Sequence, residues 1–268
     1  MLTCLSAAFA AAPGLPVRTL ALAAHPARVL VALVLLAGCT TLSLPGQHRP
    51  GAADTLAAAE PGPALQRHLE AVAAADTADT AGLAAAPYVA VMPLKDASGF
   101  VLEGWDLGGS VASLLVGRMN AYPDFRAVPW AVTEEVTGRR REVDSTAALR
   151  YGRRMQADLV VMGRIHDFNM GRFTAGDPLL GGYKSYTGTA ELELWALRTA
   201  DGEEAGRARA RSELTDRDLG LDLLGKPREQ DLGFSGLRDM TFGSPQFLET
   251  VLGKATAAVA DDVLSRLA

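Results

Sequence analysis

The thiol of Cys39 is the side chain whose neighbours point most directly to a specific reaction. It follows the small residues Ala37 and Gly38, which close an apolar run that begins at Val31. Signal peptidases require small side chains beside the bond that they cut, and an apolar run of this length is too short to cross a bilayer as a permanent helix. Arginines precede the run, as in a positively charged n-region. The pattern predicts a signal peptide that is cleaved next to Cys39.

The four residues Leu36-Ala37-Gly38-Cys39 resemble the lipobox of bacterial lipoproteins. The resemblance implies that signal peptidase recognises Leu36, Ala37 and Gly38 and removes residues 1–38. Cys39 then becomes the first residue of the mature chain and carries a covalent diacylglyceryl and N-acyl lipid. Two or more acyl chains give stable attachment to a membrane, whereas one chain gives marginal binding.

The residues after Cys39 bear on location. Thr40 and Thr41 follow it, and the absence of Asp at the second position resembles outer-membrane rather than inner-membrane lipoproteins. The expected location is therefore the outer membrane, with the lipid-anchored chain facing the periplasm. A buried apolar helix, or an ordinary secretory peptide with a coincidental cysteine, are the alternative interpretations of the apolar run.

The other reactive side chains form no catalytic pattern. Cys4 and Cys39 are the only cysteines, so the processed chain is expected to lack disulfides, a thiolate nucleophile and Cys-ligated zinc. His166 and Asp167 are neighbours on an expected strand, where successive side chains point to opposite faces, so they do not form a dyad. The sequence has neither a Gly-x-Ser-x-Gly elbow nor a phosphate-binding loop. We expect no enzyme, no metal site, no cofactor besides the lipid and no small-molecule substrate.

Charge also limits the partners. The formal net charge is −5, and two basic clusters occur at 139–141 and at Arg150, Arg153 and Arg154. The cluster at 139–141 has no interleaved aromatic residue and the net charge is negative, so nucleic-acid binding is not expected. The clusters are either a solvated helix face or a contact for anionic lipid or an acidic partner. Attachment to a membrane through the lipid, together with binding of a cell-envelope protein or self-association, are the expected interactions.

Composition divides the mature chain into residues 39–87 and residues 88–268. The first segment is rich in Ala, Pro, Gly, Thr and Asp and is predicted to be a flexible tether, because it cannot bury enough apolar surface to offset its ordering entropy. Pro63 to Ala74 could form a transient helix within it. The apolar residues on one side of that helix are Leu65, Leu69 and Val72. Residues 88–268 are expected to form one periplasmic domain.

The first half of the domain predicts alternating strands and helices. Asp106 and Asp144 precede helical patterns as candidate N-caps, and Gly138 ends a third. Short apolar runs bounded by turn residues predict buried strands. The expected elements are strand 88–94, helix 107–119, strand 125–128, helix 130–136, a helix from 145 through 155 and strand 158–165.

The second half predicts a Gly-rich loop from Asn169 to Ser185, a hairpin and a last helix. Glu191, Glu193 and Trp195 share one face of the first hairpin strand, and Arg207, Arg209 and Arg211 share one face of the second. A three-residue loop with Gly202 left-handed places Glu193 opposite Arg209 and Glu191 opposite Arg211, whereas a two-residue loop would pair the arginines with leucines. The helix starts at Ser244 and Pro245. Its apolar face carries Phe247, Val251, Ala255, Val259 and Val263.

Two segments carry a family resemblance: Val89-Ala90-Val91-Met92-Pro93-Leu94 and Ala157 through Ile165. They resemble the CsgG, LpoB and TolB amino-terminal group of periplasmic domains, although Leu94 stands where the group usually has Phe. The group implies an α/β (α+β) fold with a mixed sheet packed with helices in β-α-β-α-β-β-β-α order. Its members are lipoproteins that bind or assemble, which implies a scaffold and not an enzyme.

Contact with a partner is expected around the long loops, where exposed apolar groups suggest an interface. The candidate contact residues are Phe173, Leu179, Leu180, Tyr183, Tyr186, Leu221, Leu223 and Leu224. The alternative is a subunit of an oligomeric outer-membrane channel like CsgG, which exports curli. It would contribute hairpins from 169–189 and 215–240, but consecutive charges at 216–218 disfavour a lipid-facing strand.

Overall fold

The computed structural model describes residues 60–78, 86–177, 181–220 and 233–268. These residues form an open, mixed six-stranded sheet with helices on its faces, as predicted. The strands are β1 (Tyr88–Val91), β2 (Lys95–Asp96), β3 (Arg126–Ala127), β4 (Leu159–Asp177), β5 (Gly181–Arg198) and β6 (Glu204–Gly220). The helices are α2 (Pro63–Ala78), α3 (Leu107–Met119), α4 (Trp130–Thr137), α5 (Ser145–Arg154), the 3-10 helix η2 (Leu237–Asp239), α7 (Pro245–Glu249) and α8 (Val251–Leu267).

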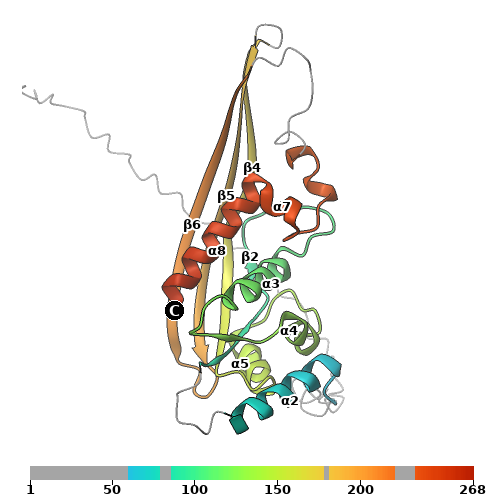
Figure 1. The fold of residues 1–268 in the computed structure, drawn as a ribbon, viewed down its shortest axis with the longest axis vertical. Coiled ribbons are helices and arrows are strands. Elements are labelled where there is room, and N and C mark those ends of the chain that lie inside the picture. Colours follow the sequence, from blue (N-terminus) through green and yellow to red (C-terminus); the bar gives the residue numbers. More distant parts are fainter. Residues whose placement is uncertain (1–59, 79–85, 178–180, 221–232) are drawn as a thin grey trace, which may run out of the picture. The chain divides into compact units, whose positions relative to one another are not determined.

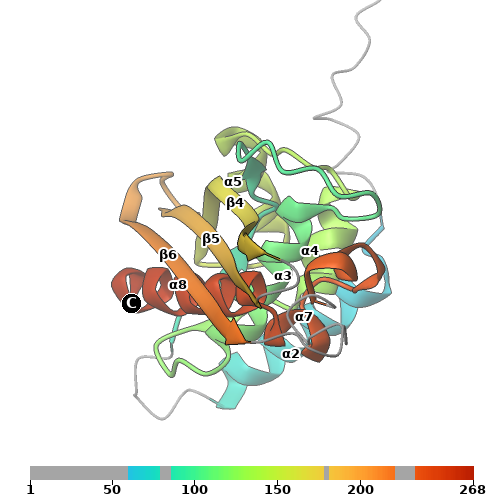
Figure 2. The ribbon, with the colours of Figure 1, turned by 90° about the horizontal axis from the view of Figure 1, so that it is seen from above.

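The strand order is β3-β1-β4-β5-β6, with β2 beside β4. β1 pairs in parallel with β3 and β4, and β4, β5 and β6 pair antiparallel in sequence order. Figures 1 and 2 show α8 lying along one face of β5 and β6, and α3 packs on the same core. α5 packs against the other face of the sheet, where an added Cβ at Gly152 would lie 2.4 Å from Val160. Among the described residues, no helix combines the length and apolar character needed to cross a bilayer.

The succession from α3 to α5 confirms the sequence prediction, whereas the strand expected at 88–94 ends at Val91 and β2 was not predicted. The Asp144 carboxylate accepts a hydrogen bond from the Ala147 amide and caps α5. Gly138 is left-handed and ends α4. Asp106 occupies the N-cap position of α3, but its side chain makes no capping hydrogen bond.

The expected Gly-rich loop at 169–185 is wrong over its described residues: 169–177 belong to β4 and 181–185 to β5, which pair from Leu159 with Arg198 to Asp177 with Gly181. Glycine usually weakens a strand interior, but it permits close approach of another backbone. An added Cβ at Gly188 would lie 2.6 Å from the Leu252 amide nitrogen. The close approach of α8 to β5 therefore explains why a glycine occupies position 188.

The last predicted helix has its apolar face as expected but is divided in two. Ser244 caps α7, with Pro245 in its first turn, and Thr250 caps α8 by accepting a hydrogen bond from the Gly253 amide. The Thr250 hydroxyl also donates to the Phe247 carbonyl. This one side chain therefore ends the first helix and starts the second.

The segment predicted as part of a tether contains a helix that packs on the domain. Within α2, Leu65, His68 and Val72 are buried, and the compact unit includes this helix. The predicted helix at Pro63 to Ala74 is thus longer than expected and is docked. Residues 39–59, like the signal segment, lie outside the described residues.

Candidate functional site

The face of β5 and β6 that is opposite α8 carries the most concentrated set of charged groups that the sequence singled out. Leu192 and Leu194 of β5 point into the core, so Glu191 and Glu193 point to the other face. We call the set on this face the ion-pair ladder. Its members are His166, Asp167, Glu191, Glu193, Glu204, Arg207, Arg209 and Arg211.

Glu193 joins β4 to β6 within this ladder. It accepts a hydrogen bond from His166 Nε2 at 2.8 Å and another from Arg207 Nη1 at 2.9 Å. Arg207 also binds Glu204 and lies over the Trp195 ring, with its guanidinium carbon 5.2 Å from the ring centroid. The carboxylate therefore ties together side chains from three strands.

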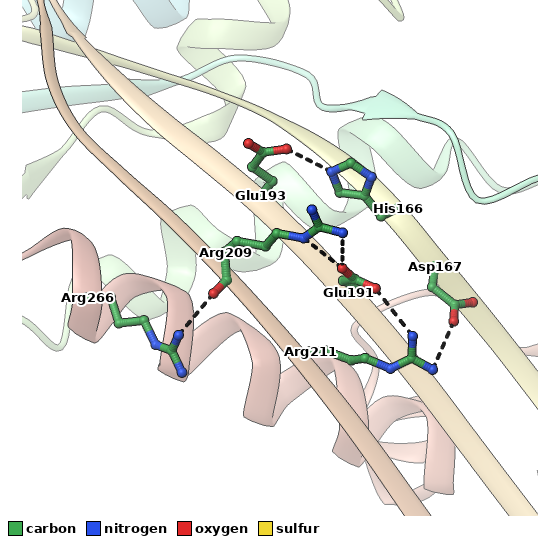
Figure 3. Close-up of polar contacts among 7 residues, drawn as sticks. All are labelled: His166, Asp167, Glu191, Glu193, Arg209, Arg211 and Arg266. Atoms are coloured by element: carbon green, nitrogen blue, oxygen red, sulfur yellow. Dashed lines mark hydrogen bonds and ion pairs between the residues drawn. The ribbon is translucent and has the colours of Figure 1, made fainter. Parts of the chain in front are cut away.

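Glu191 forms the second centre of the ladder, drawn in Figure 3. It accepts hydrogen bonds from Arg209 Nε at 2.7 Å and from Arg211 Nη1 at 3.4 Å. Arg211 continues to Asp167, with a nitrogen–oxygen distance of 3.5 Å. His166 and Asp167 thus have different partners. Their predicted placement on opposite faces is wrong, because a β-bulge between Ile165 and Asp167 puts both side chains on the ladder face.

The predicted hairpin register is confirmed, because Glu193 pairs with Arg209 and Glu191 with Arg211. Gly202 is left-handed in the connecting turn, also as expected. The ion pairs are staggered by one pair relative to the backbone register: Arg209 binds Glu191, and Arg207 binds Glu193. Diagonal neighbours on one face of a sheet are within reach of long side chains, which explains the stagger.

The ladder favours the charged form of Glu191 and Glu193. The hydrogen bond from Arg209 is the main cause that lowers the pKa of Glu191, and the hydrogen bond from His166, followed by that from Arg207, lowers the pKa of Glu193. A general acid at neutral pH needs a raised carboxyl pKa, so neither group suits that role. In the described part of the chain, no three His, Cys, Asp or Glu side chains gather as a metal site would require. The arrangement fits cross-strand stabilisation.

The Glu191→Gln variant is expected to unfold about 1 kcal/mol more easily at pH 7, because it loses charge-assisted bonds to partly exposed arginines. The folded-state pKa of Glu191 lies below the ordinary value of 4.5, so its contribution is complete above that pH and is lost as pH falls through the lowered pKa. Urea unfolding between pH 7 and pH 3 measures this difference. Glu213→Gln is the control: it removes an exposed carboxylate outside the ladder that has one 3.5 Å contact with Arg211, and it should show no difference. Equal losses in both variants would contradict the role of Glu191.

The three long strands continue past the start of α8, as Figure 1 shows. We call residues 171–177 of β4, 181–187 of β5 and 214–220 of β6 the arm. Its seven-residue strands correspond to roughly 23 Å at about 3.3 Å per residue. Phe173 of the arm is 62% exposed, and Leu214 is 38% exposed. Phe173 pairs with Ser185, which places it on the same face as the ladder.

The predicted contact residues have different positions in the structure. Phe173 is exposed on the arm, whereas Tyr186 is buried, with its ring centroid 6.2 Å from that of Phe234. The expected exposure of Tyr186 is therefore wrong, because the segment around it is a strand and not a loop. Tyr183 belongs to β5. The other predicted residues lie outside the described residues: Leu36, Ala37, Gly38, Cys39, Leu179, Leu180, Leu221, Leu223 and Leu224.

The base of the arm contains two residues that sequence reasoning missed. The Arg172 guanidinium carbon lies 5.2 Å from the centroid of the Phe234 ring, which also contacts Tyr186. Phe234 follows a segment of mixed charge, where no periodic pattern could indicate its contact. Of the two basic clusters, Arg139 pairs with Glu134 and Arg153 donates to the Thr199 carbonyl, so part of each is used within the domain.

No protein-family model and no curated protein matches the chain. Solved structures with a similar arrangement include the lipoprotein GNA1162 from Neisseria meningitidis, which is 14% identical, with a TM-score of 0.36 over 52% of this chain and 90% of that one. CT253 from Chlamydia trachomatis is 14% identical, with a TM-score of 0.40 over 68% and 95%. LpoB from E. coli is 11% identical, with a TM-score of 0.34 over 73% and 88%. At this similarity, the functional argument rests on the residues of this chain.

Proposed function

We propose that this chain is a lipid-anchored lipoprotein of the bacterial cell envelope that acts by binding or assembly and not by catalysis. Support for the anchor comes from Leu36-Ala37-Gly38-Cys39, whose pattern resembles a lipobox. Thr40 and Thr41 favour the outer membrane, with the domain facing the periplasm. The lipid on Cys39 then supplies the attachment, and the domain supplies the contacts with a cell-envelope protein or a second copy.

The observation that carries this proposal is the arm. The strands of the arm run past the start of α8, and β4 exposes the apolar ring of Phe173 there. Exposed apolar side chains on such a projection favour a contact surface. Phe173 is the residue that we expect at the centre of that contact.

The ladder supports a non-catalytic role for the adjoining face. Glu191 and Glu193 are the carboxylates that a strand-end histidine could have used in acid–base chemistry. Both instead accept hydrogen bonds from arginines, and one also binds His166. Their charges are neutralised locally, which fits a rigid surface that presents the arm.

The second candidate function is a subunit of an oligomeric outer-membrane channel. One observation favours it: segment 169–189 is a β-hairpin, as that function requires. Two observations weigh against it. Residues 216–218 carry consecutive charges, which a lipid-facing strand disfavours. In segment 215–240, β6 ends at Gly220 and η2 occupies Leu237–Asp239, so the described part of this segment includes a helical turn.

The size of the lipidated protein in mild detergent separates the two functions. Mass photometry is expected to give one or two copies for the wild type, and the same for a Cys39→Ser protein purified without detergent. A ring of many copies that forms only from the lipidated protein would overturn the binding module in favour of the channel. In that case the Phe173→Asp variant should fail to form the ring.

A further inference from the structure

Among its described side chains, helix α2 packs on the domain through a narrow buried stripe. The apolar side chains that it buries are Leu65 and Val72, at 1% and 5% exposure. His68 lies between them on the same stripe and is 7% exposed. Burial of these two aliphatic side chains contributes only a few kcal/mol to the free energy of docking. A change in the charge of His68 can therefore shift the docking equilibrium.

The first turn of α2 is fixed by Glu135 of α4. Its carboxylate accepts hydrogen bonds from the amides of Ala64 at 3.0 Å and Leu65 at 3.3 Å. A negative charge at a helix N-terminus is favourable, because the first amides have no partner within the helix. Gly62 lies against the same carboxylate, where an added Cβ would be 2.3 Å from Glu135 Oε1. This contact orients α2.

His68 is the contact that can change with pH. Its Nε2 lies 3.0 Å from the Met155 carbonyl oxygen, and its ring meets the Tyr88 ring edge to face with centroids 5.9 Å apart. A carbonyl only accepts, so Nε2 carries the hydrogen in the neutral ring and the second proton would go to Nδ1. The buried position then holds a cation without an anionic partner in hydrogen-bond contact among the interactions that the structure gives for this ring.

The charged and titratable groups on the elements around His68 do not compensate such a cation. Glu135 is engaged at the start of α2, and Asp158 accepts a hydrogen bond from the Tyr88 amide. The Arg126 guanidinium lies over the Tyr88 ring, 5.5 Å from its centroid. Tyr88 is the phenol that faces the imidazole. On α2 itself, Arg67 donates to the Pro63 carbonyl and Glu70 accepts from Gln66.

We propose that α2 is a pH-sensitive latch, which is docked on the domain at neutral pH and is released when His68 is protonated in a mildly acidic medium. Release detaches α2 from the domain and so lengthens the connection between Cys39 and the domain. This effect on reach rests on the lipid anchor proposed above. The docking equilibrium itself does not depend on the anchor.

The direction of the pH effect follows from burial. Desolvation lowers the pKa of His68 below its ordinary value of 6.5, and the Met155 carbonyl opposes this only in part. The docked state therefore binds the proton less readily than the released state. Docking is fully favoured above about pH 6.5 and weakens by up to about tenfold per pH unit below it, until the lowered pKa is reached.

Hydrogen–deuterium exchange of the full chain from pH 7.5 to pH 5.0 tests the latch. Rates are normalised to the intrinsic exchange rate at each pH. Amides of α2 are expected to exchange up to about tenfold faster per pH unit below 6.5, whereas those of α5 stay constant. His68→Gln keeps a donor for Met155 and cannot be protonated in this range, so its α2 exchange should not change with pH.

Three control variants separate protonation of His68 from other causes of faster α2 exchange. His166→Gln removes a histidine on the ladder and should retain the pH dependence. Leu65→Ala should raise α2 exchange at every pH with the same midpoint, which separates weak docking from titration even if His68→Gln undocks. Cys39→Ser should behave as the wild type, so loss of the anchor and failure of the latch are distinguishable. The latch is overturned if wild-type α2 exchange does not change with pH, or if the dependence persists in His68→Gln.

Discussion

Gly108→Ala is expected to lower the free energy of unfolding by about 2–3 kcal/mol, because the added methyl group has no space. Its Cβ would lie 2.2 Å from the Leu94 carbonyl oxygen, a backbone atom that cannot rotate away. The Gly108 carbonyl also accepts a hydrogen bond from the Leu94 amide, so the helix and the chain after β1 are locked together. Urea unfolding followed by circular dichroism measures the loss.

Gly117→Ala is the matched control in the same helix. An added Cβ there meets no atom within 4 Å, and α3 continues through Met119. Alanine in an exposed helix interior is favoured over glycine by about 0.5–1 kcal/mol, so this variant should be more stable than the wild type. Opposite signs for the two variants support close packing of α3 on the sheet. A similar change in the free energy of unfolding of both variants would contradict it.

Cys39→Ser is expected to move essentially all of the protein from the membrane fraction to the soluble periplasmic fraction of a bacterial host with an outer membrane. The serine hydroxyl takes the place of the sulfur that the proposal requires for diacylation, so no acyl chains anchor the chain. Fractionation and metabolic labelling with palmitate measure the change. The label should be lost together with membrane attachment.

Cys4→Ser is the control for the anchor, since it replaces the other cysteine at a position that the proposal assigns to the removed signal peptide. It should leave both palmitate labelling and membrane attachment as in the wild type. A Cys39→Ser protein that stays in the membrane fraction would contradict the anchor. Labelling that depends on Cys4 would do so as well.

The sequence was sufficient to predict helix ends and strand register where a local residue pattern and the tertiary contacts agree. Asp144 caps α5 and Gly138 ends α4 as their residue types indicate. The alternation of Glu193 and Arg209 predicted the hairpin register, because a slip of one residue would have buried the arginines. In each case the same residues that make the pattern also make the stabilising contact.

Prediction failed where a distant contact overrides a weak local pattern. Residues 169–177 and 181–185 contain glycines, which have low strand propensity, yet they pair with each other along β4 and β5. The docking of α2 depends on Glu135 and on the Met155 carbonyl, and neither could be assigned to this helix from the sequence. A local pattern cannot show which distant residue completes it.

The candidate site was predicted only in part. The alternation of side chains along β5 and β6 predicted which of their residues share the ladder face. It did not predict that Arg207 binds Glu193 and Arg209 binds Glu191, because these diagonal pairs depend on side-chain reach in the folded sheet. Phe173 was predicted as a contact residue and is exposed, whereas Tyr186 has the same aromatic character and is buried by Phe234. Residue type alone does not separate the two, because they lie on opposite faces of a pair of strands that was expected to be a loop.

The central claim is that the arm makes the contact with a partner, and site-specific photo-crosslinking in intact cells tests it most directly. A photoreactive phenylalanine analogue at position 173 is expected to give one discrete adduct with a cell-envelope protein or a second copy. The same analogue in place of Ala200, in the exposed turn at the other end of β5, should give none. Adducts from position 200 but not from 173, or none from either, would contradict the claim.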